Sequence, residues 1–187
     1  MRKIIVSEFL TLDGVSEDPG GAEKSRYGGW SFPFWNEEAE KYKHDELFTS
    51  DTLLLGRKTY EGFAEAWPSM TDKTGFAERM NTLPKYVVST TLQETSWHNS
   101  SLIQADIADE ITKLKMEPGQ NILVGGSGEL VNTLQQHGLV DEYHLMIHPV
   151  IVGGGKKLFR KGTECKLKLK TAKTFQTGVA VLVYETA

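Results

Sequence analysis

The sequence is almost free of cysteine, since Cys165 is the single cysteine among 187 residues. One thiol can form no intramolecular disulfide, which excludes the small secreted folds that disulfides hold together. We expect Cys165 to lie buried in a strand as a small apolar side chain. Internal repeats and low-complexity linkers are also missing, so a single domain over residues 1–187 is expected.

A long apolar run and a surplus of positive charge are missing as well. No stretch approaches the roughly 20 apolar residues of a membrane-spanning helix, and the apolar stretch near the N-terminus is too short for a signal peptide. The formal net charge of -4 argues against a nucleic-acid or anionic-membrane binder, because such proteins carry a basic face. We therefore expect a cytoplasmic protein whose partner is neither nucleic acid nor membrane.

Apolar runs alternate with helix-like segments over most of the chain, which is typical of an α/β protein with a largely parallel sheet. The last third instead contains long strand-like runs, and its final two runs predict an antiparallel hairpin joined at "QTG". Strands are expected at 3–9, 51–56, 85–90, 101–105, 121–126, 140–153, 165–175 and 179–186. Helices are expected at about 36–48, 58–66, 74–81, 106–116 and 127–137.

Three glycines fall within four residues in "NILVGGSGELV", between an apolar strand and a helical pattern that Gly138 is expected to end. At such a turn, unpaired backbone N–H groups and the positive end of the helix dipole attract an anion. Ser127 is expected to cap the helix and to contact a phosphate oxygen. The segment matches neither the dinucleotide fingerprint nor the phosphate loop, and a plain tight corner explains the glycines equally well.

Two further strand ends carry residues that suit an anion. "LLLGRKTYEGF" places a glycine, two cations and a threonine where a strand turns into a helix, although a solvated basic pair is the alternative. "KYVVSTT" ends in hydroxyls, which either bind a ligand or cap the turn. Because α/β sheets bind ligands at the carboxyl ends of their strands, the three turns together predict a site for a ligand that carries phosphate. Its expected residues are Gly56, Arg57, Lys58, Thr59, Ser89, Thr90, Gly125, Gly126, Ser127, Gly128 and Glu129.

A long irregular segment from about residue 12 to 37 is rich in glycine and in aromatic side chains. Loops of this length are usually functional or disordered, and a disordered linker would carry few aromatics. We expect the segment to fold partly over a pocket. Trp30, Phe34 and Trp35 are candidates to stack on a flat heteroaromatic substrate, although core aromatics would give the same pattern.

No histidine spacing indicates a metal site. His144 and His148 stand four residues apart in "HLMIH", which would share a helix face, but the apolar surroundings and Pro149 favour a strand. We therefore expect no bound metal. A serine hydrolase is also unsupported, because the sequence has no nucleophile elbow.

Several of these segments together resemble one family. "SEFLTLDG", "LLLGRKTYEGF", "KYVVST" and above all residues 122–159 are similar to the dihydrofolate-reductase-like superfamily, specifically the reductase domain of bifunctional riboflavin-biosynthesis deaminase-reductases. The chain resembles a short stand-alone member. The resemblance implies a three-layer fold: a central, mostly parallel sheet ends in an antiparallel hairpin and carries helices on both faces. It also implies NADPH as cofactor and a homodimer as the assembly.

The resemblance assigns roles to the three turns. Gly125 and Gly126 would face the pyrophosphate of NADPH, often through a cis peptide. The turn from Gly56 to Thr59, with Ser89 and Thr90, would surround the adenosine 2′-phosphate and the other phosphates. NADPH would then be preferred over NADH, with Arg57 as the deciding residue.

Two carboxylates are candidates for the catalytic proton donor. Asp13 follows the first strand and matches an aspartate of the riboflavin reductases, but "LDG" is also a good turn. Glu40 lies about where dihydrofolate reductases carry their acid, but its charged neighbours equally indicate a solvated helix face. The expected activity is hydride transfer from NADPH to a pterin- or pyrimidine-type ring. Dihydrofolate reductase activity, or nucleotide binding without turnover, is the alternative.

Overall fold

The computed structural model describes residues 1–187 and contains one eight-stranded sheet of order β4-β3-β2-β5-β1-β6-β8-β7. The first six strands along the chain pair in parallel, and β8 runs antiparallel to both of its neighbours. The predicted mixed sheet with its C-terminal hairpin is therefore confirmed. The strands are β1 (Ile4–Thr11), β2 (Ser50–Gly56), β3 (Lys85–Val88), β4 (Ser100–Ile103), β5 (Asn121–Gly125), β6 (Glu142–His148), β7 (Leu167–Thr174) and β8 (Ala180–Thr186).

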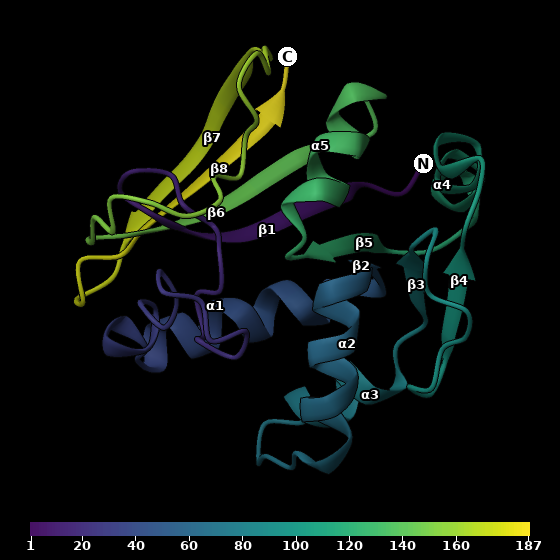
Figure 1. The fold of residues 1–187 in the computed structure, drawn as a ribbon, viewed down its shortest axis with the longest axis horizontal. Helices are drawn as coiled ribbons and strands as arrows, with labels where there is room; N and C mark the ends of the chain where they lie inside the picture. Colours follow the sequence, from purple (N-terminus) through teal and green to yellow (C-terminus); the bar gives the residue numbers. More distant parts are fainter.

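Helices cover both faces of this sheet, with α1, α2 and α3 on one side and α4 and α5 on the other (Figure 1). Two 3-10 turns, η1 (Phe32–Phe34) and η2 (Trp67–Ser69), complete the elements. No helix is long and apolar enough to span a lipid bilayer. The α-helices are α1 (Glu37–Phe48), α2 (Arg57–Ala66), α3 (Phe76–Thr82), α4 (Ile107–Met116) and α5 (Gly128–Gln136).

The central strand β1 is buried on both of its faces. Ile4 and Val6 join the apolar cluster that packs under α4 and α5, whereas Ile5 joins the cluster under α2 and α3. A strand enclosed on both faces needs no polar alternation, which explains the continuous apolar run "KIIV" in the sequence. Gly138 ends α5 with a φ of 64° and an N–H bond to the carbonyl of Gln135, as expected.

The prediction that Cys165 is buried in a strand is wrong. Cys165 is exposed and lies before the start of β7. β7 is an edge strand whose side chains are almost all exposed, because no helix covers that end of the sheet. It carries Lys168, Lys170 and Lys173, and lysines on an edge strand disfavour its pairing with the strand of another chain.

The long segment after β1 is folded, as expected. Val15 forms an isolated antiparallel bridge with Lys157, which fastens the segment to the loop after β6. The buried Asp18 side chain accepts hydrogen bonds from the backbone N–H groups of Glu23 and Ser25, at 3.0 and 2.9 Å. These contacts hold residues 15–25 close to the carboxyl ends of the central strands.

Candidate functional site

Two of the glycine turns predicted from the sequence are in direct contact. A Cβ built on Gly56 would lie 2.0 Å from Ser127 Oγ, and one built on Gly126 would lie 2.8 Å from Thr59 Oγ1. The turns meet because β2 and β5 are neighbouring parallel strands that end at the same edge. Glycine is required at both positions for this close approach.

The turn between β5 and α5 presents free hydrogen-bond donors. Gly126 and Ser127 both adopt left-handed conformations, with φ of 68° and 67°, and neither N–H group has an acceptor. The N–H groups of the first turn of α5 add to them, since a helix start leaves its first donors unpaired. Successive N–H groups in such a turn form a concave site for an anion.

Two expectations about this turn are wrong. The chain contains no cis peptide bond, and the positive φ of Gly126 reverses its direction instead. Ser127 takes the N-cap position but makes no capping hydrogen bond, because its own backbone is left-handed and its hydroxyl lies against Gly56. Gly128 lies near Ser16 Oγ, and Glu129 forms an ion pair with Arg160.

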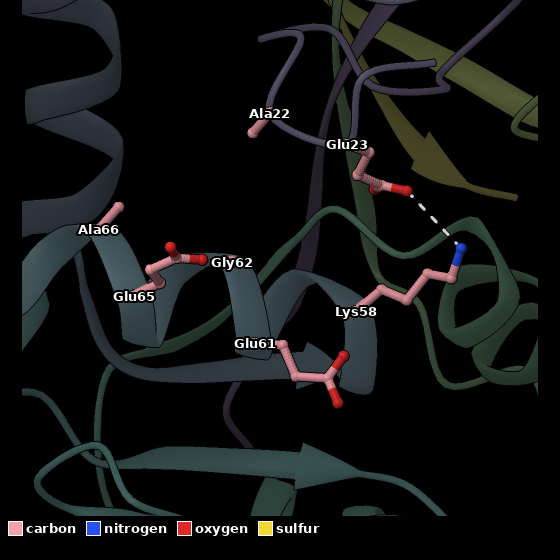
Figure 2. Close-up of a pocket in the computed structure, with 7 residues that line it drawn as sticks. All are labelled: Ala22, Glu23, Lys58, Glu61, Gly62, Glu65 and Ala66. Carbon is pink, nitrogen blue, oxygen red and sulfur yellow. Dashed lines mark ion pairs between the residues drawn. The ribbon is translucent and has the colours of Figure 1, made fainter.

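The two cations at the start of α2 are paired with carboxylates. Arg57 Nη1 donates to both oxygens of Glu61, at 3.1 and 3.0 Å, and Lys58 Nζ lies 3.6 Å from a carboxylate oxygen of Glu23. Figure 2 shows the Lys58 pair crossing a pocket of about 530 Å³ between α2 and the segment after β1. An anion that binds at the start of α2 must therefore compete with Glu61 for Arg57 and with Glu23 for Lys58. The pocket is lined by Ala22, Glu23, Lys58, Glu61, Gly62, Glu65 and Ala66.

The third turn lies at the same edge, because β3 pairs with β2 and ends opposite Gly56 at Val88. The hydroxyl of buried Ser89 accepts hydrogen bonds from the N–H groups of Thr91 and Leu92, at 3.2 and 2.9 Å. Ser89 thus stabilises its own turn, whereas Thr90 is exposed.

The two predicted carboxylates lie in different environments. Asp13 accepts hydrogen bonds from Thr11 Oγ1 at 2.6 Å and from the Gly153 N–H at 3.0 Å, and these bonds lower its pKa. Asp13 therefore fastens the end of β1 to the loop that follows β6. Glu40 lies on the exposed side of α1, and its carboxylate has no hydrogen bond or ion pair.

The predicted aromatic residues gather around a histidine that the sequence reasoning did not place in the site. The ring of His148, at the end of β6, lies 5.1 Å from that of Trp30 and 5.9 Å from that of Phe34. Phe9 of β1 joins them, with its ring 5.4 Å from His148 and 6.1 Å from the half-exposed Trp35. Burial lowers the pKa of His148, so its ring is neutral at neutral pH. These five residues are called the aromatic cluster below.

Beside the aromatic cluster, a polar network lies between α1 and the sheet. Lys43 Nζ donates to Ser7 Oγ at 2.6 Å and also to the Glu46 carboxylate, which accepts from Ser7 Oγ at 2.7 Å. His144 Nδ1 lies 2.8 Å from the other oxygen of Glu46. Burial alone would raise the pKa of Glu46, but Lys43 and His144 outweigh it and lower this pKa to about 2. Glu46 is therefore a charged anchor for Lys43 at neutral pH.

These four residues were missed in the sequence because they come from three separate elements. Lys43 and Glu46 are three positions apart on α1, which reads as an ordinary surface ion pair. Only the packing of α1 against β1 and β6 brings Ser7 and His144 to them. Nowhere in the structure are three or more His, Cys, Asp or Glu side chains grouped to hold a metal ion.

The chain has close relatives and structural neighbours. It is 33% identical to YyaP of Bacillus subtilis (strain 168), over 98% of this chain and 94% of the relative. A protein of Shewanella sp. PV-4, whose name assigns it provisionally to riboflavin biosynthesis, is 19% identical with a TM-score of 0.76 and covers 99% of both chains.

Two enzymes share the fold at lower identity. The diaminohydroxyphosphoribosylaminopyrimidine deaminase/5-amino-6-(5-phosphoribosylamino)uracil reductase of Thermotoga maritima is 14% identical with a TM-score of 0.67, over all of this chain and 57% of that one. Dihydrofolate reductase of Enterococcus faecalis is 12% identical with a TM-score of 0.63, over 98% and 96% of the two chains. The dihydrofolate-reductase-like fold is thereby confirmed. The model of the RibD C-terminal domain matches residues 2–183, and the chain belongs to that family.

Proposed function

We propose that the protein is an NADPH-dependent reductase of a pyrimidine- or pterin-type heterocycle. The observation that carries this proposal is the contact between the two glycine turns, with the free N–H groups of Gly126 and Ser127 at its centre. Those donors would hold the pyrophosphate, and Arg57, with Lys58, would hold the 2′-phosphate. When bound, NADPH supplies a hydride, so the chain has to bind both molecules and orient them.

The aromatic cluster supports a flat ring as the substrate. Phe9 and the half-exposed Trp35 lie beside the polar network, and a heterocycle with a hydrogen-bonding edge suits such a combination of aromatic and polar groups. The Thermotoga neighbour is named as a uracil-derivative reductase and the Enterococcus neighbour as a dihydrofolate reductase. Both names describe enzymes of nitrogen heterocycles. Asp13 and Glu40 stay predictions for the proton donor, and a homodimer stays a prediction for the assembly.

Arg57→Ala tests the cofactor assignment. The variant should bind NADPH more weakly by about 1 to 3 kcal/mol, the scale of one charged hydrogen bond, and should bind NADH almost unchanged. Lys113→Ala is the matched control, because Lys113 is an exposed lysine of α4 that pairs with a neighbouring glutamate. Affinities are measured by quenching of tryptophan fluorescence. An equal loss for both nucleotides would overturn the 2′-phosphate assignment.

Turnover separates the reductase from its alternatives. NADPH absorbance is followed with 5-amino-6-(5-phosphoribosylamino)uracil and, separately, with dihydrofolate. Oxidation with the first compound supports a riboflavin-type reductase, and oxidation with the second supports a dihydrofolate reductase. Tight NADPH binding with no oxidation across a panel of heterocycles would favour a nucleotide-binding module without turnover.

A further inference from the structure

The ammonium group of Lys43 has an unused hydrogen-bond donor. A lysine ammonium carries three N–H donors, and in this protein two of them have acceptors, Ser7 Oγ and the Glu46 carboxylate. The third has no acceptor among the protein atoms. Lys43 is largely enclosed, with 18% of its side chain exposed, and Glu46 is buried. The group is therefore held in one place with one donor free.

Lys43 lies between the end of β5, where the turn to α5 begins, and the aromatic cluster. Its Nζ is 5.6 Å from the centre of the Phe9 ring. Ser7, which accepts its hydrogen bond, is the register partner of Gly125 at the end of β5. Adjacent strands lie about 4.8 Å apart. A Cβ built on Gly125 would contact only Phe63, at 3.9 Å. The Lys43 ammonium therefore lies beside the end of β5, on the face of the sheet that α1 covers.

We infer that Lys43 is a specificity residue that donates a hydrogen bond to a ring carbonyl oxygen of the substrate. This inference rests on the proposed function and narrows its substrate class to oxo-heterocycles, such as a pyrimidinedione. The ring lies against Phe9 and Trp35, and its carbonyl edge points to Lys43. A cation held in this position favours rings with a carbonyl oxygen, because a ring without one leaves its free donor without that acceptor.

Neither predicted carboxylate offers an equivalent contact. The Asp13 oxygens already accept hydrogen bonds from Thr11 and from the loop after β6. Glu40 is exposed one helical turn before Lys43, and nothing fixes its carboxylate. Among the charged groups near the aromatic cluster, Lys43 combines a fixed position with a free donor.

The test measures the binding of uracil and of pyrimidine, which has the same ring without carbonyl oxygens, by ligand-detected NMR on the protein alone and with NADP⁺ added. The wild type should bind uracil more tightly than pyrimidine. Lys43→Met should lower the affinity for uracil about tenfold or more and leave that for pyrimidine unchanged. Lys41→Met is the matched control, since Lys41 lies on the same helix, is 75% exposed and pairs with Asp45.

NADPH binding is measured on every variant as a check of folding and of the proposed function. If Lys43→Met does not fold, the double variant Lys43→Met, Glu46→Gln replaces it, because the second change removes the carboxylate left without its cation. Unchanged uracil binding in a Lys43 variant that binds NADPH, or no uracil binding by the wild type, would overturn the inference. A wild type that fails to bind NADPH, yet loses its preference for uracil with Lys43→Met, would overturn the proposed function alone.

Discussion

The buried carboxyl group of Glu8 allows a quantitative prediction of how the stability of this fold depends on pH. Glu8 lies on β1, one residue beyond the point where β5 ends, and it alternates with Val6 and Leu10 toward the face under α5. The side chain is 5% exposed, and its Oε1 atom has no hydrogen-bond partner. Burial raises the pKa of Glu8 from 4.5 to about 8, although Lys43 opposes the shift. The carboxyl group is therefore mostly protonated in the folded protein at neutral pH.

This pKa fixes the sign and the size of a pH effect on stability. The folded state holds the Glu8 proton up to about pH 8, whereas the unfolded chain releases it near pH 4.5. The free energy of unfolding therefore decreases as the pH rises through this window and levels off above it. At about 1.4 kcal/mol per pKa unit, the loss between roughly pH 5 and pH 9 is about 4 kcal/mol.

Glu8→Gln isolates this contribution, because glutamine has nearly the same shape and does not titrate. Urea unfolding of both proteins is measured at a series of pH values, and all other titrating groups cancel in the difference. The variant should gain about 4 kcal/mol relative to the wild type between roughly pH 5 and pH 9. A difference that stays constant with pH would refute the reasoning, because Glu8 would then ionise as it does in the unfolded chain.

Two further predictions concern glycine and cysteine. Gly56→Ala should lower the free energy of unfolding by about 1 to 3 kcal/mol and weaken NADPH binding, because the new Cβ would overlap Ser127. Gly62→Ala in α2, the helix that follows Gly56, has nothing within 4 Å of its Cβ position and should instead add up to about 1 kcal/mol. Equal effects in urea unfolding would contradict this contrast. Cys165 should react with a thiol reagent in the native state, and Cys165→Ser should change stability by less than about 0.5 kcal/mol. A thiol that reacts only after unfolding would argue against its exposure.

The fold could be predicted from the sequence because its signals are local. Apolar runs between turn residues marked all eight strands, and the helical pattern marked the five α-helices to within a few residues. The position of the turns at Gly56 and Gly126 at one edge of the sheet also followed from a general rule, since the strands of a parallel sheet end at one edge. What the sequence could not state is that Ser127 fills the space above Gly56, because that contact depends on the order of β2 and β5 in the sheet.

The interior of the candidate site could not be predicted, because its residues come from distant segments. His148 reads as one more residue of an apolar strand, and only the pairing of β6 with β1 places it against Phe9. Lys43 reads as a surface lysine of a charged helix. Its role depends on a strand residue far away in the chain, Ser7, and such a pairing has no signal in a single sequence.

Strand β1 contains buried polar residues whose presence the packing of the core does not explain. Ile4, Ile5 and Val6 are apolar and buried on both faces, as expected of a central parallel strand. The next two residues, Ser7 and Glu8, are polar and buried, one on each face, where β5 ends and the free N–H groups begin. At Glu8 an apolar residue would give a more stable sheet, because the buried Glu8 Oε1 atom has no partner and such an atom is costly. Both residues lie at the edge where α/β sheets bind ligands, which is where the proposed function places the cofactor and the substrate.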